Sequence, residues 1–279
     1  MATFFNQASL SLNGEITNSN VTEGELLSAL SITKTALNGA YGVGEELSYL
    51  ITVSNNSSTE RVFSITDDLG AYPVGGVPVY PLSYIDGSAR LYINGVFSSL
   101  LTPVSTEPLS FEGVTLPAGA VATIAYTALA TSYAPLEAGS VITNTASIVG
   151  TEESGESTVS ARDTVSLTIA KAICPSSVSG GGSVGYTFVI QNTGNTPVVS
   201  TDNLTVSDTF NPLLTDITVT LDGVELVEGV GYSYNELTGE FATLPGVVSV
   251  PAAVYTRDPV SGALITTPGN AVLTVVGAI

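Results

Sequence analysis

The stretch SITKTALNGAYGVGEELSYLITVSNN, residues 31–56, occurs a second time in looser form as SLTIAKAICPSSVSGGGSVGYTFVIQNTGN at 166–195. Each copy begins with an alternating, strand-like segment that carries a lysine, Lys34 or Lys171, and continues through a glycine-containing turn into a second alternating segment. These two residues are the only lysines in the sequence. Because lysine is ordinarily a common surface residue, its restriction to one repeat-equivalent position indicates a specific role.

The repeat divides the chain into two domains, at residues 31–163 and 164–279. Each contains about seven short alternating segments separated by turn residues, which is typical of an immunoglobulin-like β-sandwich. Asn94–Gly95 and Asp222–Gly223 lie between alternating flanks and predict a two-residue hairpin turn in each domain. The sequence therefore predicts an all-β protein with two tandem immunoglobulin-like β-sandwich domains and an N-terminal strand extension.

Residues 1–30 stand outside the repeats. ASLSLN at 8–13 alternates as a strand, GEITNSN at 14–20 reads as a turn-rich break, and EGELLSAL at 23–30 fits either a short helix or an extended segment. A strand ahead of a complete domain has two outcomes: it pairs with the edge of its own domain, or it pairs with an edge on a neighbouring molecule. Periodicity does not separate the two.

The composition of the chain restricts which molecules it is expected to bind and how its cysteine and apolar segments are interpreted. The 279 residues carry a net charge of −19, which opposes binding to nucleic acid or anionic lipid. The N-terminus lacks the features of a signal peptide, and the most apolar run, residues 120–130, is too short to span a bilayer. Cys174 is the only cysteine, so no disulfide forms within the chain; a small buried hydrophobe is favoured over an intermolecular link.

Alignment of the repeats identifies candidate residues for covalent chemistry. The lysine lies in the first strand of each repeat, an aspartate ends the segment FSITDDL or LTVSDTF, and an asparagine lies in the segment matched as the last strand. The three pairs are Lys34 with Lys171, Asp67 with Asp208, and Asn144 with Asn270. First and last strands are often neighbours in such sandwiches, so each amine is placed to meet a carboxamide in the core.

A buried lysine favours the neutral, nucleophilic amine. A protonated aspartate in the same apolar pocket can hydrogen-bond the carboxamide and shuttle protons. The product is a Lys–Asn isopeptide bond, formed with loss of ammonia: Lys34 to Asn144 assisted by Asp67, and Lys171 to Asn270 assisted by Asp208. The competing interpretation is a lysine at a strand end, an aspartate in a turn and an asparagine bonded to the backbone.

The segments TKTALNGAYGVGEELSYLITVSNNSS, SITDDL, LPAGAVATIAYTA and VITNTASIVG resemble the conserved repeat of unknown function found in bacterial surface proteins. That repeat is similar to the fimbrial domains of Gram-positive pilins that form intramolecular isopeptide bonds. Two such repeats behind this N-terminus also resemble subunits of clostridial endospore ribbon appendages. The resemblance implies an extracellular structural or adhesive role at a cell or spore surface. Asn270 departs from the pattern, because it lies in PGNAV and not in TNTA.

Other chemistry has little support. Residues 181–185, GGSVG, fit a nucleophile-elbow pattern, but the chain has no histidine and no strand–turn–helix context there. Without histidine and with one cysteine, a transition-metal site is not expected. Calcium bound by loop carboxylates is an open alternative to simple solvation of the same charges; the candidates are Asp67, Asp68, Asp202 and Asp208. We expect no cofactor and no enzymatic turnover.

Two functions follow from different classes. The first is a structural subunit that polymerises with itself, alone or with other surface or appendage proteins, into a filament stiffened by isopeptide bonds. The alternative is a surface adhesin or binding module that presents loops such as residues 70–88 to a ligand. The first predicts polymers from the purified protein; the second predicts a soluble monomer with affinity for a target.

Overall fold

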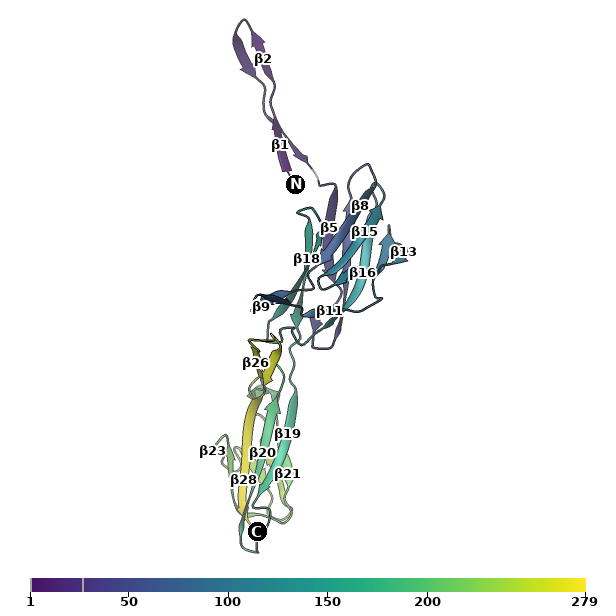
Figure 1. The fold of residues 1–279 in the computed structure, drawn as a ribbon. Coiled ribbons are helices and arrows are strands. Elements are labelled where there is room, and N and C mark those ends of the chain that lie inside the picture. The colour runs from purple at the N-terminus through teal and green to yellow at the C-terminus, as the bar shows by residue number, and fades with distance from the viewer. Residues whose placement is uncertain (1, 27) are drawn as a thin grey trace. The chain divides into compact units, whose positions relative to one another are not determined.

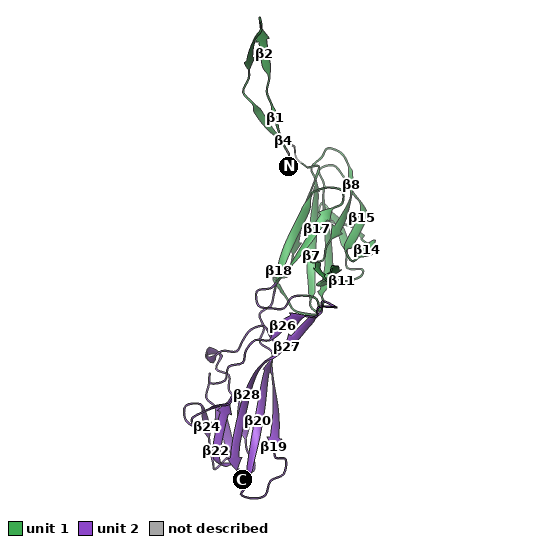
Figure 2. Cartoon of the chain, turned by 60° about the vertical axis from the view of Figure 1, so that its left-hand side comes forward, with its two compact units in different colours: residues 1–134, 141–160 green, residues 135–140, 161–279 purple. Residues whose placement is uncertain are grey.

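The computed structural model describes residues 2–26 and 28–279. The chain forms two compact units, residues 1–134 with 141–160 and residues 135–140 with 161–279 (Figure 2). Across the described residues the only helical element is the short 3-10 turn η1 (Ser200–Asp202), and everything else regular is strand. No described segment forms a helix long and apolar enough to cross a membrane. The predicted class is confirmed: an all-β chain of two immunoglobulin-like sandwiches with an N-terminal extension.

Unit 1 is built from two packed sheets (Figure 1). One sheet has the order β13-β12-β16-β7-β5, with β11 also paired to β16. Its strands are β5 (Leu30–Ala36), β7 (Glu46–Asn55), β11 (Leu82–Tyr84), β12 (Arg90–Ile93), β13 (Val96–Leu100) and β16 (Val121–Ala130). The other sheet has the order β14-β15-β8-β17-β18-β6. Its strands are β6 (Ala40–Tyr41), β8 (Arg61–Asp67), β14 (Ser105–Thr106), β15 (Leu109–Leu116), β17 (Val141–Ile148) and β18 (Ser154–Ala161).

Strict alternation in the sequence produces the core of unit 1. Strands β7 and β16 bury every second residue over ten positions, because successive side chains of a strand point to opposite faces. The predicted hairpin at Asn94–Gly95 joins β12 to β13, and both turn residues have positive φ (49° and 78°), as a type I′ turn requires. Residues 70–88 form the small hairpin β9 (Tyr72–Val74) and β10 (Val77–Val79), followed by β11.

Unit 2 repeats part of this plan. Its larger sheet has the order β19-β20-β28-β22-β23, and its smaller sheet has the order β21-β25-β24. The strands are β19 (Leu167–Cys174), β20 (Ser183–Asn192), β21 (Ser207–Thr209), β22 (Thr215–Leu221), β23 (Val224–Glu225), β24 (Tyr232–Tyr234), β25 (Glu240–Thr243) and β28 (Gly269–Ala278). A separate hairpin pairs β26 (Val254–Arg257) with β27 (Leu264–Thr267). Asp222 and Gly223 form the predicted turn between β22 and β23, with φ of 50° and 80°.

The strand pairing corrects one part of the sequence alignment. In unit 1, β16 pairs with β7 and Tyr126 lies opposite Tyr49. In unit 2, the strand in that place is β28, which pairs with β20 and sets Val275 opposite Tyr186. Segment 268–277 is thus the counterpart of LPAGAVATIAYT and not of ITNTASIVG. The inserted β26–β27 hairpin caused the mismatch, because its first strand follows the LPG turn where a counterpart of β16 was expected.

Unit 2 therefore has no counterpart of β17 and β18 among the described residues. In unit 1, β17 pairs with β8, β18 pairs with β17, and β18 continues to β6. The counterpart of β8 in unit 2 is β21, which pairs only with β25 and leaves its other edge open within the part of the chain that the structure describes. The last hairpin of the sandwich is missing at this edge.

The N-terminal extension forms a long hairpin. β1 (Ala2–Asn6) pairs with β4 (Thr22–Leu26), and β2 (Ser9–Leu12) pairs with β3 (Glu15–Asn18) around a turn at Asn13–Gly14. The expectation of a break at 14–20 is wrong, because 15–18 is a strand. Of the two alternatives for 23–30, the structure has the extended one over 23–26. Within the single chain, ASLSLN pairs with its own extension. All of residues 3–25 except Gly24 are exposed.

Candidate functional site

Lys34 and Asp67 meet inside unit 1. Lys34 lies on β5 and Asp67 ends β8, so the two side chains come from facing sheets. The Lys34 Nζ donates to Asp67 Oδ2 over 2.5 Å, and both side chains have no exposed surface. The second carboxylate oxygen, Oδ1, accepts the backbone N–H of Leu69 at 3.0 Å. The structure brings together the first predicted lysine–aspartate pair in a dry environment.

Asn144 reaches the same pocket through a tyrosine. The Tyr126 hydroxyl donates to Asp67 Oδ2 at 2.6 Å and accepts a hydrogen bond from Asn144 Nδ2 at 3.0 Å. The Oδ1 of Asn144 is buried and accepts no hydrogen bond from any described residue. A buried polar atom without a partner is costly and rare in a folded protein. The Asn144 carbonyl oxygen is an exception to that rule, as is the Tyr49 hydroxyl.

Two tyrosine rings form the walls of the pocket. Tyr49 and Tyr126 stack with ring centroids 5.4 Å apart, and the Lys34 Nζ lies 5.2 Å and 5.7 Å from those centroids. The repeat marks Tyr49, which recurs as Tyr186, but it does not mark Tyr126. Tyr126 does occupy a core-facing position in a long alternating segment, but its role depends on the β7–β16 register.

Burial sets the protonation of the pocket. It lowers the pKa of Lys34 from 10.5 to about 8, against the opposing effect of the Asp67 charge. Burial also raises the pKa of Asp67, with Lys34 acting in the other direction, and raises the pKa of Tyr126 well above its usual value. Desolvation disfavours every charged form here. Burial thus shifts the two pKa values in the directions that favour a neutral Lys34 amine and a protonated Asp67 carboxyl.

Local backbone geometry places Asn144 at this point. β17 pairs with β8 so that Ala146 lies opposite Asp67, and Asn144 is two residues further along the same face. Gly155 on β18 lies opposite Ala146 and packs against β5, where an added Cβ would come within 2.8 Å of the Lys34 backbone nitrogen. A larger residue at 155 would push β17 and β18 away from the lysine strand.

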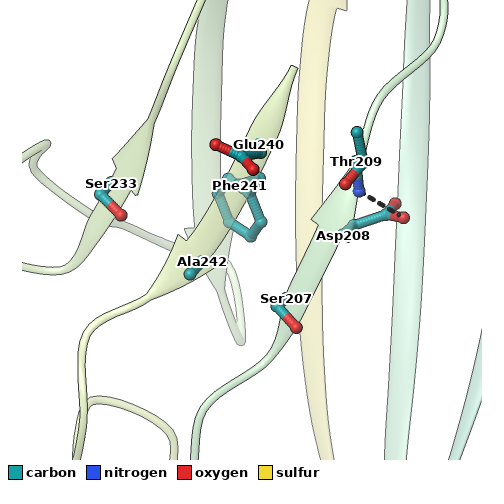
Figure 3. A pocket seen from close by; sticks show the side chains of 7 residues that line it. All are labelled: Ser207, Asp208, Thr209, Ser233, Glu240, Phe241 and Ala242. Atoms are coloured by element: carbon teal, nitrogen blue, oxygen red, sulfur yellow. Dashed lines mark hydrogen bonds between the residues drawn. The ribbon is translucent and has the colours of Figure 1, made fainter. Parts of the chain in front are cut away.

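The second pair, Lys171 and Asp208, also forms an ion pair, but in different surroundings. The Lys171 Nζ donates to Asp208 Oδ2, with 40% of the lysine side chain exposed. The Nζ lies over the rings of Tyr186, Phe188 and Phe210. Figure 3 shows Asp208 on β21, with its carboxylate directed away from β25 and bonded by the Thr209 backbone N–H at 2.9 Å.

Asn270 is not part of this second site. It is the second residue of β28, lies opposite Gln191 and is exposed. Its Oδ1 accepts a hydrogen bond from Gln191 Nε2, and its Nδ2 donates to the Pro268 carbonyl. Lys171 lies on β19, with β20 between the two strands. The predicted pairing of Asn270 with Lys171 followed from the mistaken match of β28 to β17, so Asn270 does not supply a carboxamide to the second pair.

The remaining candidates from the sequence, the other carboxylates proposed for calcium and Cys174, lie in turns or on exposed strands. Asp68 Oδ1 accepts the backbone N–H groups of Gly70 and Thr145, and Asp202 Oδ2 accepts that of Val199. No group of three or more His, Cys, Asp or Glu side chains able to hold a metal occurs among residues 2–26 and 28–279. Cys174 is exposed at the end of β19, which corrects the expectation of a buried hydrophobe: the strand that carries it is uncovered.

Comparison with known proteins gives only distant structural likenesses. No protein-family model matches the chain, and no curated protein matches it. Among solved structures, the major pilin subunit BcpA of Bacillus cereus is similar at 13% identity and a TM-score of 0.35, over 95% of this chain and 73% of that one. The pilus backbone RrgB of Streptococcus pneumoniae is similar at 13% identity and a TM-score of 0.32, over 86% and 55%.

The collagen-binding domain of a Staphylococcus aureus adhesin is similar at 12% identity and a TM-score of 0.31, over 48% of this chain and 99% of that one. With TM-scores well below 0.5, none of these likenesses carries weight for the function, which has to come from the chain's own residues.

Proposed function

We propose that the chain is a structural subunit of a filament or appendage on a cell or spore surface. In this proposal unit 1 is stiffened by an isopeptide bond between Lys34 and Asn144, and subunits join through the N-terminal extension. The observation that carries it is the buried series Lys34–Asp67–Tyr126–Asn144, because such a costly arrangement of polar groups has no evident purpose in a simple binding module.

The bond would form once, after folding. The neutral Lys34 amine attacks Asn144 Cγ, and the carbonyl electrons move onto Oδ1. Asp67, in its protonated form, supplies a proton to the departing nitrogen, directly or through the Tyr126 hydroxyl, and then takes the proton that the amine loses. The Cγ–Nδ2 bond breaks, ammonia leaves, and an amide joins β5 to β17. A covalent tie between the first strand of the sandwich and its closing hairpin would resist separation of the sandwich under tension.

The extension supports self-assembly. Its hairpin carries exposed Phe4, Phe5, Leu10, Leu12 and Ile16. Apolar strands with open edges are aggregation hazards unless a partner covers them. A neighbouring subunit that covers this hairpin would make a head-to-tail contact, and such a contact builds open filaments unless the geometry closes a ring. The acidic, hydroxyl-rich composition would limit sideways clumping of those filaments.

Intact mass of the denatured protein tests the bond. We expect a deficit of one ammonia for unit 1, abolished in Lys34→Ala and in Asn144→Ala. A monomer whose mass equals that of the unmodified sequence would remove the crosslink from the proposal.

Electron microscopy of purified protein tests the assembly. We expect filaments from the full chain and a folded, soluble monomer after deletion of residues 1–20. Filaments that survive the deletion would exclude the extension as the joint. A monomeric full-length protein that binds a ligand would favour the adhesin alternative.

A further inference from the structure

The open edge of unit 2 and the uncovered N-terminal hairpin are complementary features of the same chain. Unit 2 has no counterpart of β17 and β18, while the extension is a hairpin that packs on nothing among the described residues. In unit 1, the corresponding place is filled by the hairpin that carries Asn144.

The sequence of the extension matches β17. FFNQASLS, residues 4–11, aligns without a gap to ITNTASIV, residues 142–149. Asn, Ala and Ser coincide at three positions, and the inward-facing positions of β17 all have counterparts of the same character. The pairs are Phe4 with Ile142, Asn6 with Asn144, Ala8 with Ala146, and Leu10 with Ile148. In both places this strand is followed by a turn and a returning strand, β18 or β3–β4.

The acceptor edge has the matching apolar surface. Ile169 on β19 is 59% exposed, whereas its counterpart Ile32 on β5 is 7% exposed beneath the closing hairpin. A hollow beside β19 is lined by apolar side chains of β19, β20 and the segment before β21: Leu167, Ile169, Ile190, Leu204 and Val206. In unit 1, Ile148 lies opposite Ile65, the counterpart of Val206. The match therefore sets Leu10 at this hollow.

The same register brings Asn6 to the second lysine. Ala146 lies opposite Asp67 in unit 1, so Ala8 is expected opposite Asp208, with Asn6 two residues further along. Lys171 already bonds Asp208 and lies over three aromatic rings. The lysine, the aspartate and aromatic neighbours are thus already present, and the incoming hairpin would bring the carboxamide and cover the partly exposed pair.

We propose that the N-terminal hairpin of one molecule completes unit 2 of a second copy, and that Lys171 of the acceptor then forms an isopeptide bond with Asn6 of the donor. This inference rests on the proposed self-assembly and names its acceptor and its covalent seal. The Lys171 amine, once deprotonated, forms a bond to Asn6 Cγ. Asp208 accepts the amine proton and returns a proton to Nδ2, the Cγ–Nδ2 bond breaks, and one ammonia is released per junction.

Chain connectivity favours a second copy over the same molecule as acceptor. Residues 28–30 enter unit 1 beside the β17–β18 turn, where Ser28 Oγ donates to Glu153 at 2.5 Å. The chain leaves unit 1 at the far end of the eight-residue strand β18, about 26 Å away. Thr22, which pairs with Asn6, is eight positions before Leu30 (30 − 22 = 8), a reach of at most about 29 Å. A fully extended segment would therefore only just reach the end of β18, and Lys171 is ten positions further along the chain (171 − 161 = 10).

The test uses denaturing gels and intact masses of the full-length protein and of single substitutions. The wild type is expected to give a ladder of covalent oligomers in which each added junction removes one more ammonia. Lys171→Ala and Asn6→Ala should each abolish the ladder while keeping the unit 1 deficit of one ammonia. Asn18→Ala and Asn270→Ala are matched controls and should keep the ladder.

Mixing the two defective chains gives the sharpest result. Lys171→Ala can donate Asn6 but cannot accept, and Asn6→Ala can accept but cannot donate, so the mixture should give a covalent dimer and nothing larger. A monomer with two ammonia lost and no ladder would show closure within one molecule and overturn the proposal. Loss of the ladder in Asn18→Ala with its retention in Asn6→Ala would overturn the assignment of Asn6.

The two proposals fail differently. Filaments that form but dissolve into monomers in denaturant would refute the covalent junction and leave strand exchange standing. Absence of filaments and of any ladder would refute both.

Discussion

Units 1 and 2 carry the same lysine–aspartate pair in opposite states of enclosure. In unit 1 the pair is fully buried beneath β17 and β18, with a tyrosine linking it to Asn144. In unit 2 the pair lies at an open edge, with Lys171 40% exposed. The lysine strand and the aspartate strand alone therefore do not make the dry pocket. The closing hairpin makes it, and the same hairpin brings the carboxamide.

In the proposed filament, this difference would give the two units different roles. A closed pocket can react as soon as its own unit has folded, and thereafter contributes strength. An open pocket has to wait for a strand from outside, so its reaction would be coupled to assembly. One sandwich design would then serve both as a stiff segment and as a joint, according to where in the chain its last hairpin is placed.

The largest expected effect is the loss of the buried lysine. Lys34→Ala should prevent the proposed crosslink, which would close a loop of 110 residues (144 − 34) and, by analogy with a disulfide, contribute about 4–5 kcal/mol. In chains where the bond has not formed, the same change leaves Asp67 buried without its cation, at a cost of about 3–5 kcal/mol. Lys171→Ala, in the isolated monomer, should cost at most about 1 kcal/mol because the pair is partly solvated. Chemical denaturation of both variants measures the contrast. Equal losses would show that the two pockets are not differently enclosed.

The matched isoleucines should show a smaller contrast. Ile32→Ala removes a side chain that is 7% exposed and should cost about 2–5 kcal/mol, whereas Ile169→Ala, at 59% exposed, should be within about 1 kcal/mol of wild type in the monomer. In assembled filaments the Ile169→Ala variant should lose stability too, because the donor hairpin covers it. Denaturant midpoints for monomer and filament decide this, and an Ile169→Ala filament as stable as wild type would contradict coverage of β19.

The sequence was sufficient for the fold and for half of the site. Alternation over β7, β16 and β20, and the Asn94–Gly95 and Asp222–Gly223 turns, predict sandwiches because those patterns act locally. Lys34 and Asp67 could be named because the repeat gives each a counterpart, Lys171 and Asp208. Asn144 was named through the mistaken match to Asn270, and the structure nevertheless places it in the same pocket.

The rest depended on pairing that no local pattern encodes. Asn270 was matched to Asn144 because the inserted β26–β27 hairpin occupies the place where a counterpart of β16 was expected. Cys174 was expected to be buried because the missing closing hairpin could not be recognised before β28 was placed. The role of Tyr126 depends on which residue lies opposite it across two strands, and so on a register that appears only in the folded sheet.

The pH dependence of an uncrosslinked unit 1 gives a third comparison. Asn144→Ala cannot form the bond and keeps Lys34 buried with a pKa near 8, below its ordinary 10.5. Above pH 8 the native state binds fewer protons than the unfolded state, so stability should rise with pH. The gain between pH 8 and about 9.5 is at most about 2 kcal/mol. Burial raises the pKa of Tyr49, so the gain in stability should reverse above pH 10, where tyrosine ionises in the unfolded state.

A flat dependence of stability on pH would mean that Lys34 keeps an ordinary pKa. Adding Lys34→Met to Asn144→Ala should abolish the rise.

The smallest expected effect comes from removing the Tyr126 hydroxyl while keeping its ring, which separates the hydrogen bonding of this residue from its packing. Tyr126→Phe keeps the ring that stacks on Tyr49 and removes the hydroxyl that donates to Asp67 and accepts from Asn144. In the Asn144→Ala background the change should cost about 1 kcal/mol, since one hydrogen bond is lost and the ring remains. With Asn144 present, the substitution should slow the loss of ammonia, because Asp67 and the carboxamide are no longer bridged.

Unit 2 has Val275 at the counterpart position, so its junction should form without any such relay. Mass spectra taken at intervals after refolding measure the rate. A rate unchanged in Tyr126→Phe would mean that Asp67 transfers protons to Asn144 directly in unit 1. In the proposed junction Asp208 would have to act on Asn6 in the same direct way, because position 275 is a valine.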